Sequence, residues 1–339
     1  MKTTIKDIAR EAGVSPSTVS RALHNNPRIS EDVRIKIKRI AKEMDFHPNQ
    51  MARSLVSRTS RIVGIVFPGN AEQSLGHPFY PAVLQGLGHV AGERKYHMLL
   101  ATGSDAVTAE EATSKLVESG YVSGLIVLAA EDSPEEDVSV PVVVIGRPPN
   151  AKECYYVDTD NIKAGYTATQ YLLDRGHRRI LLIGYDKQYI VTVDRRRGYE
   201  RALLESGIEF RRDWVVPSQF IQNNTDSDLL GAIFKADDRP TAVVSMDDAL
   251  SIGLAGFLST MGLSVPSDVS IISFNNTESG RYHTPGLTSF DVDPYRLGVS
   301  AMTLMLDRLK DKIDGPTAIE VPFSLIERES VTYNHSLDS

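Results

Sequence analysis

The sequence contains very little cysteine, with Cys154 as the only one in 339 residues. One cysteine excludes a disulfide within the chain and a zinc site built from cysteines, and it fits a reducing compartment. The N-terminal residues lack the apolar core of a signal peptide, and no stretch approaches 18 uncharged apolar residues. We therefore expect a soluble cytoplasmic protein with no membrane partner, no metal and no other cofactor.

The signatures of common catalytic sites are also missing. The chain has no Gly-Lys-Ser/Thr phosphate loop, no His-Glu-x-x-His and no Gly-x-Ser-x-Gly. Residues 86–92 miss the dinucleotide fingerprint by one residue and do not directly follow a strand pattern, so we interpret their glycines as close helix packing. Asp247 and Asp248 are adjacent in the chain, and we expect their side chains to face apart. The sequence therefore does not predict an enzyme.

Negative charge dominates the chain but is unevenly distributed. The net charge is −7, yet residues 1–61 hold 13 Lys and Arg against 6 Asp and Glu, a net of +7, while the remainder holds 24 against 38, a net of −14. A basic module favours a polyanion, because phosphate neutralisation supplies most non-specific affinity for nucleic acid. The length suggests a small head and a body of two lobes, of which only the basic head would touch DNA.

Residues 5–23 predict two short helices joined by a glycine turn. Apolar residues recur at helical spacing before Gly13, which can adopt the turn conformation. Ser15 can cap the second helix and Pro16 suits its first position. The same pattern occurs in ordinary helical bundles, but the basic charge favours a DNA-binding unit. A third helix is predicted after Ser30, with these inward residues: Val33, Ile37, Ile40, Ala41 and Met44.

Beyond the head, the hydrophobic pattern changes. Residues 47–61 are polar and basic, with a possible short helix over 50–56. Apolar runs then alternate with amphipathic helices; the runs cover residues 62–67, 98–101, 125–128, 142–145, 180–183, 242–245 and 270–274. Such runs indicate parallel sheets covered by helices on both faces. Ligands in these folds bind at the carboxyl ends of the strands, so the loops there are the expected binding site.

Several blocks of sequence together resemble the LacI/GalR (lac-repressor) family. They occur in order over nearly the whole chain and comprise residues 5–21, Phe46-His47-Pro48-Asn49, Ala52-Arg53-Ser54-Leu55, Asp160-Asn161, Gly176-His177-Arg178-Arg179-Ile180, Arg195-x-x-Gly198-Tyr199, Pro240-Thr241-Ala242, Asp248-x-x-x-x-Gly253, Val265-Pro266-x-Asp268-Val269-Ser270 and Pro285-x-Leu287-Thr288-Ser289. Within the family, the chain is most similar to the maltose-operon repressors of Gram-positive bacteria. The cues are residues 49–57, 77–81 and 191–195.

The resemblance implies an all-α helix-turn-helix head before an α/β two-lobed effector domain like the periplasmic binding proteins. The expected head covers residues 1–46 and the linker, with its short hinge helix, residues 47–61. The N-terminal lobe is expected to comprise residues 62–160 and 292–316, and the C-terminal lobe residues 161–291 and 317–330. Residues 331–339 would form a tail.

The head residues that would meet DNA follow from the resemblance. Pro16, Ser17 and Arg21 occupy base-reading positions, and Arg21 can bridge guanine O6 and N7, although a plain phosphate contact is the alternative. Phosphate contacts are expected from Thr4, Ser15, Thr18, Ser20 and His24. The linker would contribute Asn49, Met51, Ala52, Arg53 and Leu55, with Leu55 as a wedge in the minor groove or, alternatively, an ordinary linker residue.

The expected sugar site combines charged groups that fork to hydroxyls with aromatic rings that stack on sugar faces. Arg195 is the leading candidate, whereas Arg196 and Arg197 are interpreted as a solvated helix face. Asp247 and Asn275 match effector-contacting positions, although Asn275 departs from the usual Phe-Asp of the family, and Asp248 is expected to cap the next helix. The remaining candidates are His77, Phe79, Tyr80, Asp160 and Asn161, with packing as the alternative for Phe79 and helix capping for Asp160 and Asn161.

The resulting hypothesis is a transcriptional repressor controlled by a small sugar effector, maltose or a maltodextrin. Two alternatives stay open. One is a sugar-binding transport protein, which the basic head disfavours. The other is a global catabolite regulator that uses a phosphocarrier protein, which the resemblance disfavours because Thr303 stands where that branch has Arg. A palindromic double-stranded operator implies a homodimer. No leucine heptads follow Ile326, so a tetramer is not expected.

Overall fold

The computed structural model describes residues 3–23, 25–46, 60–70, 75–103, 109–128, 138–185, 189–217 and 227–334. The chain divides into two units, residues 1–59 and residues 60–339, which are described separately. No helix in the described ranges is long and apolar enough to cross a membrane. Within the same ranges, no group of three or more His, Cys, Asp and Glu side chains is placed to hold a metal ion.

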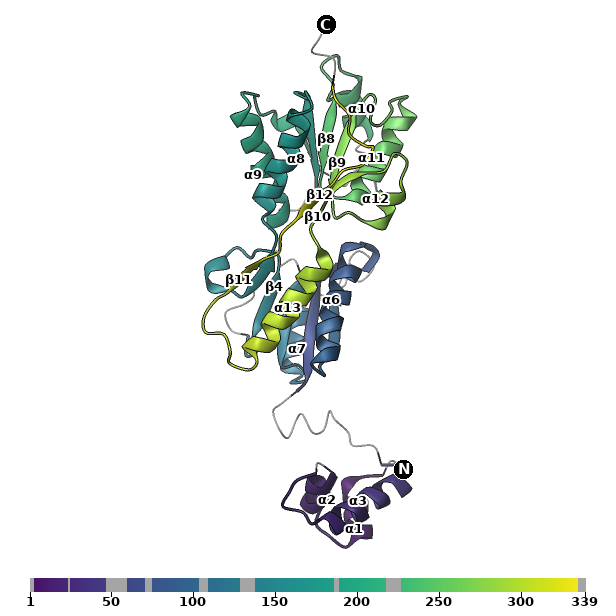
Figure 1. The fold of residues 1–339 in the computed structure, drawn as a ribbon, viewed down its shortest axis with the longest axis vertical. Helices are drawn as coiled ribbons and strands as arrows, with labels where there is room; N and C mark the ends of the chain where they lie inside the picture. Colours follow the sequence, from purple (N-terminus) through teal and green to yellow (C-terminus); the bar gives the residue numbers. More distant parts are fainter. Residues whose placement is uncertain are drawn as a thin grey trace. The chain divides into compact units, whose positions relative to one another are not determined.

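The first unit is a three-helix head made of α1 (Ile5–Ala12), α2 (Pro16–Leu23) and α3 (Glu31–Glu43) (Figure 1). Gly13 ends α1 in the left-handed region at φ 71°, as its predicted turn requires. The predicted apolar faces meet in one core formed by Ile8, Ala9, Ala12, Val19, Ala22, Ile37, Ile40 and Ala41. Ser30 occupies the cap position of α3 as expected, but its side chain makes no capping hydrogen bond.

The second unit begins with a six-stranded sheet in the order β11-β5-β4-β3-β1-β2, in which every pairing is parallel. The strands are β1 (Ile62–Asn70), β2 (His97–Gly103), β3 (Gly124–Leu128), β4 (Val142–Ile145), β5 (Tyr156–Asp158) and β11 (Ala318–Glu320). Helices α6 (Phe79–Glu93) and α13 (Pro294–Arg308) pack on one face, and α7 (Ala109–Glu118) covers the other. The 3₁₀ helix η1 (Ala151–Glu153) precedes β5. This sheet and its helices are the first lobe.

A second six-stranded sheet has the order β12-β10-β9-β8-β6-β7. Its strands are β6 (Ile180–Gly184), β7 (Val215–Pro217), β8 (Ala242–Ser245), β9 (Ser270–Phe274), β10 (Thr288–Asp291) and β12 (Ser324–Ile326). The helices of this second lobe are α8 (Asn161–Leu173), α9 (Ile190–Glu205), α10 (Ser227–Lys235), α11 (Asp248–Thr260) and α12 (Glu278–Tyr282), with the 3₁₀ helix η2 (Arg212–Trp214) before β7. Only the β10–β12 pairing among the described strands is antiparallel. The architecture confirms the predicted two-lobed α/β fold after an all-α head.

The chain passes between the two sheets three times: after β5, after β10 and after β11 (Figure 1). The predicted lobe boundary at residues 316/317 is wrong, because β11 pairs with β5 of the first sheet before the chain crosses to β12. The signal was weak: β11 and β12 have three residues each, too few for a recognisable period. The remaining lobe boundaries stay predictions.

Helices α6 and α13 approach so closely that glycine is required on both. A Cβ atom on Gly86 would lie 2.0 Å from the Tyr295 carbonyl oxygen, and one on Gly298 would lie 2.2 Å from that of Val83. These distances are far inside van der Waals contact. The Gly86 to Gly92 segment therefore serves helix packing at Gly86, in agreement with its interpretation from sequence.

Candidate functional site

Arg195 on α9 is a buried cation of the second lobe. Its Nε donates to Asn161 Oδ1 at 3.0 Å and its Nη1 donates to the Met246 carbonyl oxygen at 2.8 Å. The guanidinium carbon lies 4.0 Å from the centre of the Phe274 ring. Burial lowers the pKa of Arg195 to about 10, so the side chain remains charged at neutral pH. A fixed, desolvated charge stands at the end of β8 and β9.

Asp247 takes the capping role that was expected of Asp248. Asp247, not Asp248, caps α11, since its Oδ1 accepts from the Leu250 amide at 2.8 Å. Asp248 is buried and accepts from Thr277 and from the Ser289 hydroxyl, the latter at 2.8 Å. The predicted cap was wrong because α11 begins at Asp248 itself, one residue earlier than expected, while the backbone at Asp247 is extended, at φ −159° and ψ 171°, as a cap requires.

His77, which belongs to the first lobe, contacts the Asp247 carboxylate of the second lobe. Its Nε2 lies 3.3 Å from Asp247 Oδ2 and 3.4 Å from the Tyr185 hydroxyl, which belongs to the second lobe. A cavity of about 200 Å³, here named the interlobe cavity, lies beside this contact. It is lined by His77, Pro78, Asp247, Asp248, Ala249, Ile252, Asn275, Thr277 and Ser279. Three predicted effector residues, His77, Asp247 and Asn275, thus lie around one space.

Asn275 supplies the cavity wall at the end of β9. Its backbone has φ 89°, a conformation that Asn tolerates better than most residues, and its amide donates to the Phe290 carbonyl at 2.8 Å. Phe79 and Tyr80 do not reach the wall formed by the described residues. Both pack against the core of the first lobe, where their rings meet edge to face at 5.3 Å. Packing, the alternative expected for Phe79, therefore applies to both rings.

Asp160 and Asn161 act on the start of α8. Asp160 caps the helix by accepting from the Lys163 amide at 2.9 Å, which is the alternative role considered for it. Asn161 is buried, and its amide donates to Asp158 Oδ1 at 3.1 Å while its oxygen accepts from Arg195. Asn161 therefore positions Arg195 instead of lining the interlobe cavity. Arg196 and Arg197 pair with Glu200 and Asp194, and Arg197 is exposed as expected of a solvated face.

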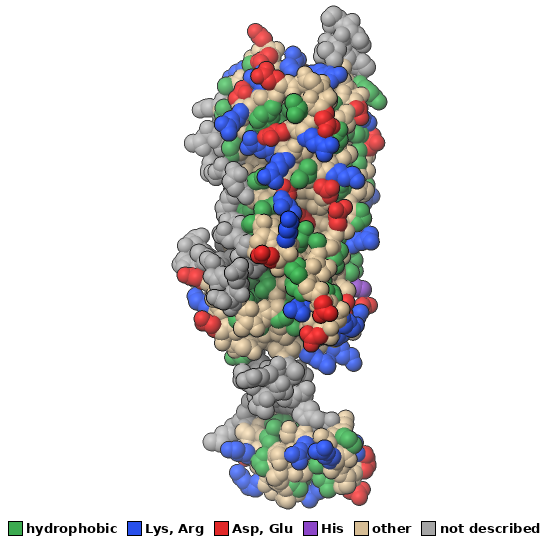
Figure 2. Space-filling model, turned by 90° about the vertical axis from the view of Figure 1, so that its left-hand side faces the viewer, with side chains coloured by type: hydrophobic (Ala, Val, Ile, Leu, Met, Phe, Trp, Pro, Cys, Tyr) green, Lys and Arg blue, Asp and Glu red, His purple; other side chains and the backbone are tan. Residues whose placement is uncertain are grey.

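The head presents a polar surface on α2. The Ser15 hydroxyl lies 2.8 Å from the Ser17 hydroxyl and accepts from the Thr18 amide at 3.2 Å, while Pro16 and Arg21 are exposed. Figure 2 shows Lys and Arg side chains spread over the surface of the head. Ser20 is half-buried on the same helix.

Other predicted DNA-contacting residues divide into two groups. Thr4 forms a capping box with Asp7, whose pKa is lowered by the hydrogen bonds from Thr4. The rest lie outside the described residues: His24, Asn49, Met51, Ala52, Arg53 and Leu55.

Comparisons with known proteins agree with both units. Residues 4–49 match the family described as bacterial regulatory proteins, lacI family, and residues 169–331 match a periplasmic binding protein-like domain. The transcriptional regulator MalR of Streptococcus pneumoniae is 34% identical over 81% of this chain and 84% of its own length. The repressor PurR of Pectobacterium atrosepticum is 31% identical over 97% of this chain and 96% of its own.

The chain belongs to the LacI family of transcriptional repressors. Among solved structures, a CelR–cellobiose complex has a TM-score of 0.73 at 27% identity, covering 97% of this chain and all of that one. The lac repressor dimer bound to operator and an anti-inducer has a TM-score of 0.83 at 20% identity, covering 98% and 100%. The relatives are named as regulators, in agreement with the expectation that this LacI-family chain is not an enzyme.

An ion pair between the lobes of this LacI-family chain was missed from the sequence. Arg147, which follows β4, donates from Nε to Asp194 Oδ2 at 3.0 Å and from Nη2 to Asp194 Oδ1 at 2.7 Å. Asp194 is buried beside Arg195 on α9. No local pattern pairs residues 47 positions apart, so only the tertiary fold brings this contact together. The hydrogen bonds to Asp194 raise the pKa of Arg147.

Asp158, next to this ion pair, should make stability depend on pH. Burial raises the pKa of Asp158 to about 6 from an ordinary value of 3.8, although the amides of Thr159 and Arg147 hydrogen-bond its carboxylate. Between these two values the folded protein binds more protons at this site than the unfolded chain, so its contribution to stability falls as pH rises from about 4 to about 6.

The test compares urea unfolding of the wild type and Asp158→Asn at pH 4, 5, 6 and 7. We expect the wild type to lose stability relative to the variant across pH 4 to 6, with no further change in the difference above that window. If the free energies of unfolding of the wild type and the variant changed in parallel over the whole pH range, Asp158 would not have a raised pKa in the folded protein.

Proposed function

We propose that this LacI-family repressor acts in the cytoplasm as a homodimer on a palindromic operator and responds to maltose or a maltodextrin. The observation that carries the effector assignment is the interlobe cavity, where His77 of one lobe meets Asp247 and Asn275 of the other. Imidazole, carboxylate and amide groups can form hydrogen bonds with sugar hydroxyls. The 34% identity to MalR and the cellobiose in the CelR complex support a glucoside.

The effector can control DNA binding because residues of both lobes line the interlobe cavity. A ligand that touches both lobes binds better to one relative position of the lobes than to another. If the operator favours the other position, sugar and DNA affinities are coupled, typically by about 1 to 3 kcal/mol. The Arg147–Asp194 pair also joins the lobes and would contribute to the difference between these positions.

The direct test measures DNA binding with and without sugar. A palindromic operator is selected by the full-length protein from randomised DNA, and its affinity is measured by fluorescence anisotropy in buffer, glucose, maltose and maltotriose. Maltose or maltotriose should change the affinity about 5- to 150-fold. An operator affinity that no sugar alters, together with no thermal shift for any glucoside, would reject the effector and favour the phosphocarrier-dependent alternative.

Arg21 provides a separate test of the head. Its exposed side chain on α2 is expected to contact a guanine, so Arg21→Ala should weaken specific operator binding by about 1 to 3 kcal/mol and relax base preference at one symmetric position. The control is Arg39→Ala on an exposed surface of α3, where Arg39 Nε lies 3.6 Å from Glu43 Oε1. An equal loss on operator and random DNA would identify Arg21 as a phosphate contact instead.

A further inference from the structure

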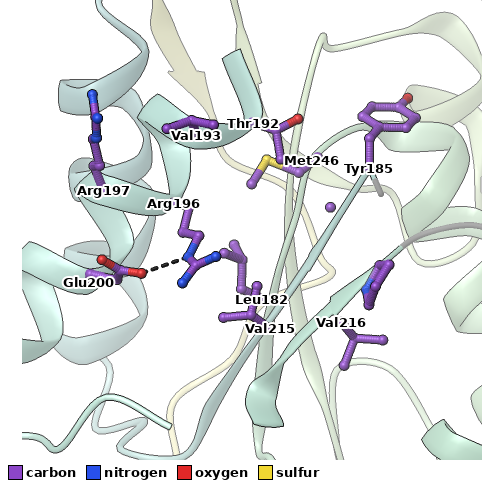
Figure 3. A pocket seen from close by; sticks show the side chains of 12 residues that line it. Leu182, Tyr185, Thr192, Val193, Arg196, Arg197, Glu200, Val215, Val216 and Met246 are labelled. Atoms are coloured by element: carbon purple, nitrogen blue, oxygen red, sulfur yellow. Dashed lines mark hydrogen bonds and ion pairs between the residues drawn. The ribbon is translucent and has the colours of Figure 1, made fainter. Parts of the chain in front are cut away.

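A second cavity lies within the second lobe, between α9 and the strands β6 and β7. Its volume is about 310 Å³, near the lower end of the range of about 300 to 1,000 Å³ that ligand pockets occupy. We name it the second-lobe cavity. Figure 3 shows its lining residues, which are Leu182, Gly184, Tyr185, Thr192, Val193, Arg196, Arg197, Glu200, Val215, Val216, Pro217 and Met246.

The wall of this cavity is apolar with polar groups at separate points. The Thr192 hydroxyl is buried and has no hydrogen-bond partner within the described part of the chain. Arg196 and Glu200 form a hydrogen-bonded ion pair of 2.6 Å, marked in Figure 3. Leaving a buried hydroxyl without a partner is unfavourable, and a ligand hydroxyl could supply the missing bond.

The linings of the two cavities meet at the carboxyl ends of strands of the second sheet. Met246 lines the second-lobe cavity and the next residue, Asp247, lines the interlobe cavity. Tyr185 also lines the second-lobe cavity, and its hydroxyl lies 3.4 Å from His77 of the interlobe cavity. A ligand longer than one ring could therefore place its successive parts in neighbouring spaces.

We propose that the second-lobe cavity is a subsite for a second pyranose ring of a linear glucoside whose first ring occupies the interlobe cavity. The apolar side chains would pack against the ring face, the Tyr185 ring would stack, and Thr192 would bond a hydroxyl. A purely apolar ligand fits less well, because it would leave the Thr192 hydroxyl unpaired. This subsite rests on the proposed function, because it requires the first ring to bind in the interlobe cavity. Its consequence is that the repressor binds disaccharides more tightly than monosaccharides.

The experiment titrates full-length protein with glucose, maltose and maltotriose by calorimetry. The wild type should bind maltose at least about 10-fold more tightly than glucose, since a bond to Thr192 is worth up to about 10-fold and packing adds to it. Thr192→Val removes only the hydroxyl, and it should weaken maltose binding about 3- to 10-fold while glucose affinity stays within about 2-fold. The melting temperature without ligand should not fall, because the deleted hydroxyl has no partner within the described part of the chain.

Two further variants complete the test. Val193→Phe should fill the second-lobe cavity and abolish the advantage of maltose while glucose still binds. Thr303→Val, which alters a first-lobe hydroxyl bonded to the Val299 carbonyl, should leave both affinities unchanged. Equal affinity for glucose and maltose, or unchanged maltose binding in Thr192→Val, would overturn the subsite and leave the proposed function standing. Failure of the wild type to bind any of the three sugars would overturn both.

Discussion

Replacing Arg195 with Met is expected to weaken effector binding by about 2 to 5 kcal/mol, or roughly 30-fold to several thousand-fold. Arg195 is not among the residues that line the interlobe cavity, but its guanidinium holds the carbonyl of Met246, the residue before the cavity-lining Asp247, and the family resemblance places Arg195 at the effector. Methionine fills a similar volume but provides neither charge nor donors. The substitution would also leave the buried Asn161 oxygen without its donor, so we expect a loss of folding stability of about 1 to 3 kcal/mol.

Effector affinity is measured by calorimetry with maltose, at a temperature where circular dichroism shows the variant to be folded. The matched control is Arg201→Met on the same helix, because Arg201 is exposed, where it pairs with Glu205 and its guanidinium carbon lies 5.2 Å from the centre of the Tyr166 ring. This exposed pair should contribute little to stability and nothing to effector binding. If Arg195→Met bound maltose as tightly as Arg201→Met, Arg195 would have a purely structural role.

Gly86→Ala is expected to destabilise the first lobe by about 3 kcal/mol or more. The added methyl group would overlap the backbone of α13, with its carbon 2.0 Å from the Tyr295 oxygen and 2.8 Å from the Val299 nitrogen. Backbone atoms cannot move aside as a flexible side chain can. Separating the helices would open the core in which Leu87 and Ala301 are fully buried.

Gly92→Ala is the control on the same helix, since no atom lies within 4 Å of a Cβ built at Gly92. Alanine there should leave stability unchanged or raise it by up to about 1 kcal/mol, because glycine is the poorer helix former. Urea unfolding followed by circular dichroism at 222 nm measures both variants. Equal stability of the two variants would mean that α6 and α13 do not form the close contact described above.

Glycines also allow a close contact between two helices of the second lobe. A Cβ on Gly198 would lie 2.1 Å from the Ile162 carbonyl oxygen, and one on Gly165 would lie 2.1 Å from the Arg195 carbonyl oxygen. Helices α8 and α9 therefore meet backbone to backbone beside the candidate effector site. This close approach fixes the base of Arg195 relative to Asn161, which explains how a long side chain keeps one position.

The head and the main strands could be predicted because their signals are local. Gly13, the helical spacing of Ile8 and Ala12, and the continuous apolar run of β1 each involve residues within one turn or one strand. Short strands such as β7 and β11 gave no comparable signal, because three residues cannot display a period. The predicted cap at Asp248 failed for a related reason: two adjacent acids look alike in sequence, and one backbone angle distinguishes them.

The sequence by itself determined the family, the helix-turn-helix head, the alternation of buried strands and helices, and the residue types available for a sugar, because each depends on near neighbours in the chain. Only the tertiary structure decided which of those residues meet. It placed His77 against Asp247, joined Arg147 to Asp194, and packed Phe79 and Tyr80 against the core of the first lobe. It also revealed the cavity at Thr192. These outcomes depend on packing between residues far apart in sequence, and no local pattern records such contacts.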